Sequence, residues 1–503
     1  MIQIDGKSLT LEDFRRVSLA GDSCAISLEA VRAVRKGREL IASVEHGGEV
    51  IYGVNTGFGK LSKQRIPPEK LSSLQRRLLM SHAAGVGPPL PDPAVRGMML
   101  LRANALARGH SGVRPELLEL LIELLNAGVL PVVPRRGSVG ASGDLAPLAH
   151  LALPLIGLGK VRVAGTEMSA ADGLRQAGLE PLSLEAKEGL ALINGTQAMT
   201  ALLALAVVEA TRLSKIADLL GAMTTDALRG TDQAFDARIH DLRPYPGQQA
   251  SAANLWRLLQ GSEIRESHRE GDGRVQDSYS IRCMPQVHGA VRGVISDAEA
   301  KLAVEMNAVT DNPLIFPATG EMLSGGNFHG EPIAFAADSL AIALAELGSI
   351  SERRIEKLTN SAFSGLPPFL VEDAGLNSGF MIAQVTAAAL VSENKILCHP
   401  ASVDSIPTSA DKEDHVSMGM GAALKLHQVA SNVRLVLAIE LLAAAQGIDL
   451  LRPLRTSPRL EALHEDLRVK VESWKEDREM SPDIEEAVRF LVGKMNPHLA
   501  ELG

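Results

Sequence analysis

The residues with the most distinctive chemistry are Ala141, Ser142 and Gly143, within the run GSVGASGDLAPLAH over 137–150. Because glycine has no Cβ, the Gly143 amide nitrogen can approach the Ala141 carbonyl carbon more closely than the nitrogen of any other residue. Loss of water would close a five-membered ring, and loss of the Ser142 hydroxyl as a second water would leave an exocyclic methylene. The product, a methylidene-imidazolone, is an electrophile that no ordinary side chain provides.

A turn is the ordinary interpretation of such a Gly- and Ser-rich stretch. The spacing does not fit a hydrolase nucleophile elbow, because Gly143 follows Ser142 directly instead of two residues later. No Gly-Lys-Ser/Thr follows the glycines, which excludes a phosphate-binding loop. The plain loop and the electrophile therefore both stay open until the chemistry of the rest of the chain is considered.

Two of the three tyrosines lie in unusual surroundings. Tyr52 lies in the glycine-rich stretch IYGVNTGFGK, which can direct its hydroxyl into a cavity, and Tyr279 lies three residues before Arg282. A tyrosine has a pKa of about 10, so forming the phenolate at pH 7 costs about 4 kcal/mol and requires a nearby cation or helix N-terminus. The alternative for each tyrosine is a half-buried residue with a hydrogen-bonded hydroxyl.

Other side chains could bind or orient a small molecule, although each also has an ordinary structural interpretation. Arg282 could share a helical face with Tyr279 and clamp a carboxylate through its planar guanidinium, or be a solvated surface group. Asn194 could hold a cofactor carbonyl or be satisfied within the core. The ordinary interpretation of His82 is a partly buried histidine. That of Phe328 is a core aromatic, and that of Glu413 is a solvated charge. The chain has no HExxH or CxxC, so we expect no metal site.

The elements that position these residues are expected to be mainly helical. Ala/Leu-rich segments with helical spacing recur near 189–225, 285–310, 330–360, 376–397 and 417–448. Only 3% of the 503 residues are aromatic, which favours closely packed aliphatic helices. We expect a small globular N-terminal domain over 1–110, contributing Tyr52 and His82, and an elongated helical bundle over 111–503, carrying the loop 141–143. Minor β structure is expected as hairpins around Asp5-Gly6 and Ala164-Gly165.

Composition restricts the possible partners and location. The formal net charge is −9 and is spread along the chain, which argues against nucleic acid or an anionic membrane as a partner. Three widely spaced cysteines and an N-terminus without an apolar signal core favour a reduced, cytoplasmic compartment. The uncharged run 189–208 contains Asn194, Thr196 and Gln197, which would be unpaired in lipid, so we expect a buried helix there.

Taken together, the motifs show that the chain resembles the aromatic amino acid ammonia-lyases, which use a self-made methylidene-imidazolone. The resemblance covers nearly the whole chain. It rests on YGVNTGFG (52–59), SHAAGVG (81–87), GSVGASGDLAPLAH (137–150), LINGTQA (192–198), VQDSYSIRCMPQVHG (275–289), SGGNFHGEP (324–332) and SVDSIPTSADKEDHVS (402–417).

The resemblance implies roles for the matching residues. Ala141, Ser142 and Gly143 become the prosthetic group, and no metal or nucleotide is required. Tyr52 removes a β-proton, while Asn194 and Tyr279 hold the electrophile and the substrate amine. Arg282 binds the substrate carboxylate, with Gln276 nearby. His82 and Glu413 contact an imidazole ring. Phe328 packs against the cofactor.

The implied activity is the non-oxidative deamination of L-histidine to trans-urocanate and ammonia, because Ser81-His82 looks like the histidine-selective pairing. Family members are homotetramers whose active sites draw on three subunits. The sequence leaves open whether the substrate amine or its ring meets the electrophile. Two alternatives remain: a lyase or aminomutase acting on tyrosine or phenylalanine, and a non-catalytic helical scaffold with the family fold.

Overall fold

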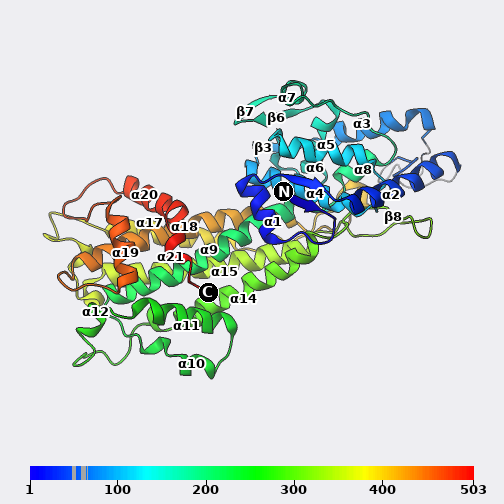
Figure 1. Cartoon of the computed structure of the whole chain (residues 1–503). Helices are drawn as coiled ribbons and strands as arrows, with labels where there is room; N and C mark the ends of the chain where they lie inside the picture. Colours follow the sequence, from blue (N-terminus) through cyan, green and yellow to red (C-terminus); the bar gives the residue numbers. More distant parts are fainter. Residues whose placement is uncertain (48–52, 58–63, 65) are drawn as a thin grey trace. The chain divides into compact units, whose positions relative to one another are not determined.

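The computed structural model describes all residues except 48–52, 58–63 and 65, and it divides the chain into two compact units (Figure 1). The first unit comprises residues 1–206, 298–338 and 400–424, and the second comprises 207–297, 339–399 and 425–503. The boundary expected near residue 110 therefore lies inside the first unit. The physical reason is that α4 (Asp92–Ala107) and α5 (Pro115–Asn126), on either side of that position, pack together through buried leucines.

The structure confirms the prediction of a mainly helical fold with minor strands. The four longest helices each contain one of the boundaries between the units: α9 (Gln197–Ala227), α14 (Met284–Glu305), α15 (Glu331–Thr359) and α18 (Gly419–Asp449). The other helices of the first unit are α1 (Leu11–Arg15), α2 (Leu28–Gly47), α3 (Leu71–His82), α6 (Leu145–Ala152), α7 (Ala170–Ala177) and α8 (Glu188–Ile193). Those of the second unit are α10 (Ala237–Asp241), α11 (Pro246–Leu259), α12 (Glu263–Glu266), α13 (Tyr279–Arg282), α16 (Ser361–Ser364), α17 (Met381–Leu397), α19 (Pro458–Arg468), α20 (Ser481–Gly493) and α21 (Asn496–Leu499).

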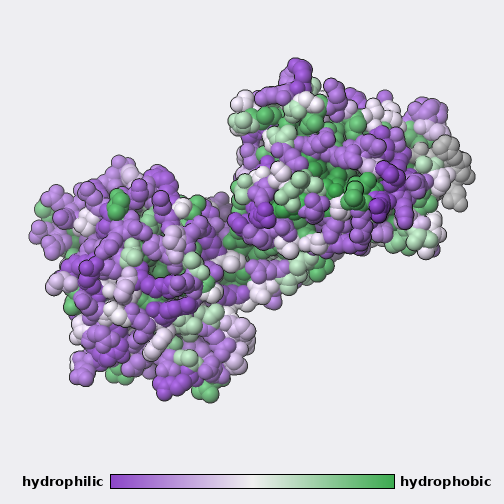
Figure 2. All heavy atoms as spheres, in the orientation of Figure 1, coloured by the Kyte–Doolittle hydropathy of each residue, from purple (hydrophilic) through white to green (hydrophobic). Residues whose placement is uncertain are grey.

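Two of the long helices, α15 and α18, are long and apolar enough to span a membrane. Of their most apolar windows, however, 67% and 78% of the residues are buried inside the protein, as expected for core helices. The visible surface is mostly hydrophilic, with hydrophobic side chains in smaller patches (Figure 2). The apolar character of these helices is therefore explained by burial within the protein.

The uncharged run 189–208 is not the single helix that its composition predicts. The helix α8 ends at Ile193 and α9 begins at Gln197, with Asn194-Gly195-Thr196 between them. Side chains from elsewhere take the hydrogen bonds that a continuous helix would make there. Arg102 Nη1 donates to the Asn194 carbonyl oxygen (2.7 Å). The Asp144 carboxylate accepts from the Ala198 and Met199 amides in the first turn of α9. The interruption places Asn194 at the surface of a cavity.

Small sheets complete the first unit, and one of the two predicted hairpins is wrong. The strands β6 (Lys160–Val163) and β7 (Thr166–Ser169) form the predicted hairpin, with β4 (Leu130–Pro131) beside β6. At the N-terminus, β1 (Ile2–Ile4) instead pairs in parallel with β2 (Cys24–Ile26). The reason is that Thr10 and Asp13 form a capping box that starts α1 where the second strand was expected. The other strands are β3 (Val86–Pro89), β5 (Pro134–Arg136), β8 (Leu314–Phe316) and β9 (Glu321–Leu323).

The second unit contains buried polar groups among its aliphatic helices. Glu440 of α18 accepts hydrogen bonds from Arg354 Nη2 of α15 (2.8 Å) and from Thr224 Oγ1 of α9 (2.9 Å). His288 Nδ1 of α14 lies 2.7 Å from Asp218 Oδ1 of α9. Breaking such a buried pair leaves an uncompensated charge, so these contacts fix how the helices of this unit pack against one another.

Candidate active site

A cavity of about 910 Å³ in the first unit brings together five of the residues that the sequence singled out. They are His82, Ser142, Asn194, Phe328 and Glu413. These residues come from α3, the loop before α6, the break between α8 and α9, the loop before α15, and the loop before α18. The same cavity is lined by Arg77 and Lys412, two cations that the sequence interpretation did not single out.

The backbone at 142–143 makes a tight turn. Ser142 has φ 49° and Gly143 has φ 71°, two consecutive residues in the left-handed region. A serine rarely adopts such a φ, so the surrounding structure must hold the turn in place. Gly143 faces Gly195, and a Cβ at position 143 would lie 2.0 Å from the Gly195 carbonyl oxygen. Only glycine therefore fits at position 143.

Asp144 ties this turn to the start of α9. Its backbone amide donates to the Gly195 carbonyl oxygen (2.7 Å), and its Oδ2 accepts from the amides of Ala198 (3.0 Å) and Met199 (2.9 Å). Its Oδ1 accepts from Ser138 Oγ (2.7 Å). The carboxyl group is fully buried, and burial raises its pKa to about 6 despite these hydrogen bonds. The carboxylate thus stabilises the turn from one side and the helix N-terminus from the other.

The raised pKa of Asp144 makes a prediction for stability. The Asp144 carboxyl group contributes most to the free energy of unfolding below its ordinary pKa of 3.8. This contribution is lost as pH rises through about 6. A rise of the Asp144 pKa from 3.8 to about 6 corresponds to about 3 kcal/mol. Asp144→Asn cannot ionise and its amide can still bond to Ser138, so the difference in melting temperature, variant minus parent, should rise between about pH 4 and pH 7. A difference that stays constant across this range, in thermal melts of the two proteins, would contradict the burial argument.

Arg102 is a functional candidate that the sequence interpretation missed. It is fully buried, and its Nη1 donates to the Asn194 carbonyl oxygen (2.7 Å) and to Gln197 Oε1 (3.0 Å). Burial lowers its pKa to about 10, which leaves the guanidinium charged at pH 7. The available signal was an arginine inside the apolar run MMLLRANALA of α4. Arg102 thus holds the backbone of the break at 194–196, the segment against which Gly143 packs.

Asn194 is held in place but keeps one polar atom available. Its Nδ2 donates to Asp311 Oδ1 (3.2 Å) and to the Asn312 carbonyl oxygen (3.1 Å), and Asp311 in turn pairs with the buried Lys187 (2.8 Å). Its buried Oδ1 has no hydrogen-bond partner among the residues that the structure describes. A buried acceptor without a donor is costly. Because Asn194 lines the cavity, this oxygen is suited to bind a donor on a ligand or prosthetic group.

Glu413 and His82 contribute polar groups to the cavity wall, and Glu413 lies next to Ser142. Glu413 Oε1 accepts from Ser142 Oγ (3.2 Å), and its Oε2 accepts from Thr408 Oγ1 (2.6 Å). His82 Nδ1 lies 3.0 Å from the Leu78 carbonyl oxygen and so donates to it, which leaves Nε2 as an acceptor in the neutral ring. Burial lowers the pKa of His82, so the ring is neutral at pH 7. The cavity therefore offers a carboxylate and a neutral imidazole to a polar ligand.

The predicted residues Gln276, Tyr279 and Arg282 are not among those that line the cavity. Tyr52 lies outside the described residues, although Gly57 of the same loop does line the cavity. Gln276, Tyr279 and Arg282 belong to the second unit. Tyr279 is 70% exposed, and the Arg282 Cζ atom lies 4.5 Å from the centroid of its ring.

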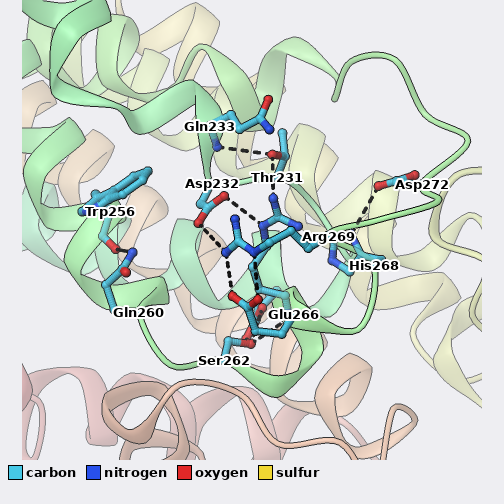
Figure 3. A network of polar contacts seen from close by, with 12 residues as sticks. Thr231, Asp232, Gln233, Trp256, Gln260, Ser262, Glu266, His268, Arg269 and Asp272 are labelled. Atoms are coloured by element: carbon cyan, nitrogen blue, oxygen red, sulfur yellow. Dashed lines mark hydrogen bonds and ion pairs between the residues drawn. The ribbon is translucent and has the colours of Figure 1, made fainter.

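The segment before α13 is anchored within the second unit. Asp277 Oδ2 accepts from the Thr231 amide (2.7 Å), and Arg282 Nε donates to the Asp277 carbonyl oxygen (3.1 Å). The turn that contains Thr231 is itself held by Asp232, which pairs with Arg265 (2.9 Å) and reaches Arg269 (Figure 3). These contacts present Arg282 and Tyr279 together on a fixed backbone, as their spacing in the sequence predicts.

Comparison with known proteins agrees with this geometry. Residues 9–469 match the profile of the family described as aromatic amino acid lyase. The chain is 56% identical to a histidine ammonia-lyase of Anaeromyxobacter sp. (strain K), over 97% of this chain and 98% of that protein. A second histidine ammonia-lyase, from Deinococcus radiodurans, is also 56% identical, over 95% of this chain and 91% of that protein.

Two solved structures have the same fold. The histidine ammonia-lyase from Trypanosoma cruzi superposes with a TM-score of 0.92 at 46% identity, covering 99% of this chain and 95% of that one. The tyrosine aminomutase from Streptomyces globisporus superposes with a TM-score of 0.95 at 40% identity, covering 100% of this chain and 98% of that one. With a family match that spans most of its length, the chain belongs to the aromatic amino acid lyase family.

Proposed function

We propose that the chain is a histidine ammonia-lyase, which converts L-histidine to trans-urocanate and ammonia without an oxidant. The observation that carries the proposal is the approach of Glu413 Oε1 to Ser142 Oγ (3.2 Å) in a cavity that His82 also lines. An imidazole has two polar edges, which a carboxylate and a neutral histidine can bind, whereas a phenyl ring has none. The identity of the chain to histidine ammonia-lyases over nearly its whole length supports the same substrate.

We propose further that Ala141, Ser142 and Gly143 cyclise to a methylidene-imidazolone. The positive φ angles at 142 and 143 and the absence of room for a Cβ at 143 support this assignment. When formed, the group supplies an electrophile that helps to turn the amine into a leaving group. Asn194 Oδ1, an acceptor with no partner among the described residues, is suited to orient a donor beside it.

The chain's own residues would bind the substrate and move its protons. Glu413 binds the imidazole edge together with His82, while Phe328 covers the wall next to the prosthetic group. Arg282 clamps the substrate carboxylate, with Gln276 nearby, because a guanidinium makes two parallel hydrogen bonds to a carboxylate. Tyr52 takes the β-proton and Tyr279 assists at the amine, the roles that the family resemblance implies.

Two measurements on the purified protein test this function. Incubation with L-histidine should produce urocanate, seen by its ultraviolet absorbance, and the intact chain should be lighter than its sequence by two water molecules. Cinnamate or coumarate formed from phenylalanine or tyrosine, with no urocanate from histidine, would assign the chain to another specificity of the family. An unshifted mass and no product from any of the three amino acids would identify a non-catalytic scaffold.

We also propose a cytoplasmic homotetramer that binds neither nucleic acid nor membrane and builds each active site from several subunits. The exposure of Tyr279 beside Arg282 supports this arrangement, because a clamp for a small substrate needs a covering surface. The helix α17 also exposes apolar side chains on its surface. They are Met381, Ile382, Val385 and Ile396.

Co-expression of two inactive variants tests whether subunits share sites. Suppose that Ser142 and Arg282 of one site come from different chains. Random assortment of Ser142→Ala and Arg282→Ala subunits in a closed oligomer then leaves roughly a quarter of the sites with both residues intact. The mixture should therefore recover up to roughly a quarter of parental activity. The matched control pairs Ser142→Ala with Glu413→Gln, two residues that line one cavity of one chain, and should recover none. Absence of recovery in the first pair would contradict shared sites.

A further inference from the structure

Two histidines and a glutamate converge beside the cavity without taking part in the chemistry described so far. The donor atoms of His329, Glu331 and His415 all lie within 4.8 Å of one another. His329 and Glu331 lie at the start of α15, where Glu331 is the first residue, and His415 lies in the loop before α18. The two imidazole rings are stacked, with centroids 5.8 Å apart and planes 8° from parallel.

We propose that these three residues form a binding site for a divalent transition-metal ion of the zinc class. Two imidazoles and one carboxylate are a donor set that zinc, cobalt and nickel accept, whereas magnesium and calcium prefer oxygen ligands throughout. Ligands at about 2.0–2.2 Å from a tetrahedral ion lie about 3.4 Å apart, so the side chains need to move inward by only about 1 Å. The proposal stands on this geometry and is independent of the proposed function.

The environment of the three side chains favours a cation. Among the residues that the structure describes, no lysine or arginine forms an ion pair with Glu331. His329 and Glu331 are half-buried and His415 is exposed, which leaves an open coordination position for water. The His329 Nε2 atom is 3.3 Å from the His415 carbonyl oxygen, so the two segments already meet without an ion.

The backbone segments that carry His329, Glu331 and His415 are fixed by hydrogen bonds to the Val139 and Gly140 carbonyl oxygens, shortly before Ser142. Ser417 Oγ donates to the Gly140 carbonyl oxygen (3.2 Å), and the Met418 amide donates to the Val139 carbonyl oxygen (2.8 Å). The Gly330 amide also reaches the Gly140 carbonyl oxygen (3.4 Å). Because both segments rest on residues 139–140, the site is largely prearranged and metal binding requires mainly side-chain rotation.

A bound ion would join the two segments that form part of the cavity wall. Phe328 precedes His329 directly, and Glu413 lies two residues before His415; both line the cavity. The ion would therefore fix the distance between the segments that carry Phe328 and Glu413, without itself contacting the cavity. The expected consequence is a change in substrate affinity and thermal stability rather than a new reaction.

Metal binding to the full chain, prepared without a histidine tag and freed of metal with a chelator, tests the proposal. Equilibrium dialysis against Zn²⁺ should give one ion per chain, and Co²⁺ should give the visible absorption of a low-coordinate nitrogen and oxygen site. His329→Gln and His415→Gln should each weaken Zn²⁺ binding at least about tenfold. Glu331→Gln, which keeps the shape of the side chain, should do the same and serves if a histidine variant folds poorly.

The matched control is His498→Gln, because His498 faces a single carboxylate, Asp466, at 3.0 Å. It should bind Zn²⁺ as the parent does. Zn²⁺ should also raise the melting temperature of the parent and of this control but not of His329→Gln. Binding of less than one ion per chain, or equal binding by the parent and the three ligand variants, would overturn the proposal.

Discussion

Replacing Ser142 by alanine should abolish the loss of two waters from the chain and lower kcat by at least about 10⁴, the scale expected when a covalent catalytic group is removed. Without the hydroxyl, no elimination can create the methylene, so no electrophile forms. The Ser142 side chain is half-buried and, before cyclisation, its hydroxyl makes one hydrogen bond, to Glu413, so the variant should still fold. Intact-protein mass and urocanate production measure the two effects separately.

Ser138→Ala is the matched control for this substitution. It removes a hydroxyl from the same loop but leaves the tripeptide intact, with Asp144 still bound by the amides of Ala198 and Met199. We expect the control to retain the mass deficit and most of the activity. Full turnover by Ser142→Ala, or a normal mass deficit in that variant, would contradict the assignment of the electrophile to this loop.

Replacing Glu413 by glutamine should lower kcat for histidine by about 10–100-fold, because the imidazole edge loses its hydrogen bond to a charged group. The amide is nearly isosteric and can still bond to Thr408, so the effect isolates the charge and the proton-accepting ability of the carboxylate. The mass deficit should be unchanged, because the tripeptide is intact. Steady-state rates at saturating histidine, together with the intact mass, make this measurement.

The neighbouring residue provides the control for the Glu413 substitution. Asp414 is exposed and does not line the cavity, so Asp414→Asn should change kcat less than about twofold. A rate for Glu413→Gln within about threefold of the parent would remove Glu413 from the chemistry. Loss of the mass deficit in Glu413→Gln would instead mean that this carboxylate serves formation of the electrophile.

Much of the candidate site could be predicted from local chemistry. The tripeptide 141–143 is recognisable because its reactivity depends on adjacent residues, and Tyr279 and Arg282 share a face because they are three residues apart. Arg102 could not be assigned in this way. Its partner, the Asn194 carbonyl, lies 92 residues away, and no local pattern indicates which buried carbonyl an arginine will meet.

The errors in the fold have the same origin. The composition of residues 189–208 is helical throughout, yet the chain breaks at Asn194 because Arg102 and Asp144 capture backbone groups from outside the helix. Likewise, β1 pairs with a strand about twenty residues away rather than with the next apolar segment. Both outcomes depend on hydrogen-bond partners supplied by tertiary contacts, which override local propensity.

The sequence by itself determined the helical class, the family motifs and the tripeptide with its potential electrophile. Helical periodicity and ring-forming chemistry are properties of neighbouring residues, so they can be read without a fold. Only the tertiary structure decided that Ser142, Glu413, His82 and Asn194 line one cavity, and that His329, Glu331 and His415 converge beside it. Those groupings arise when distant segments exclude water and satisfy one another's polar groups, and they exist only in the folded chain.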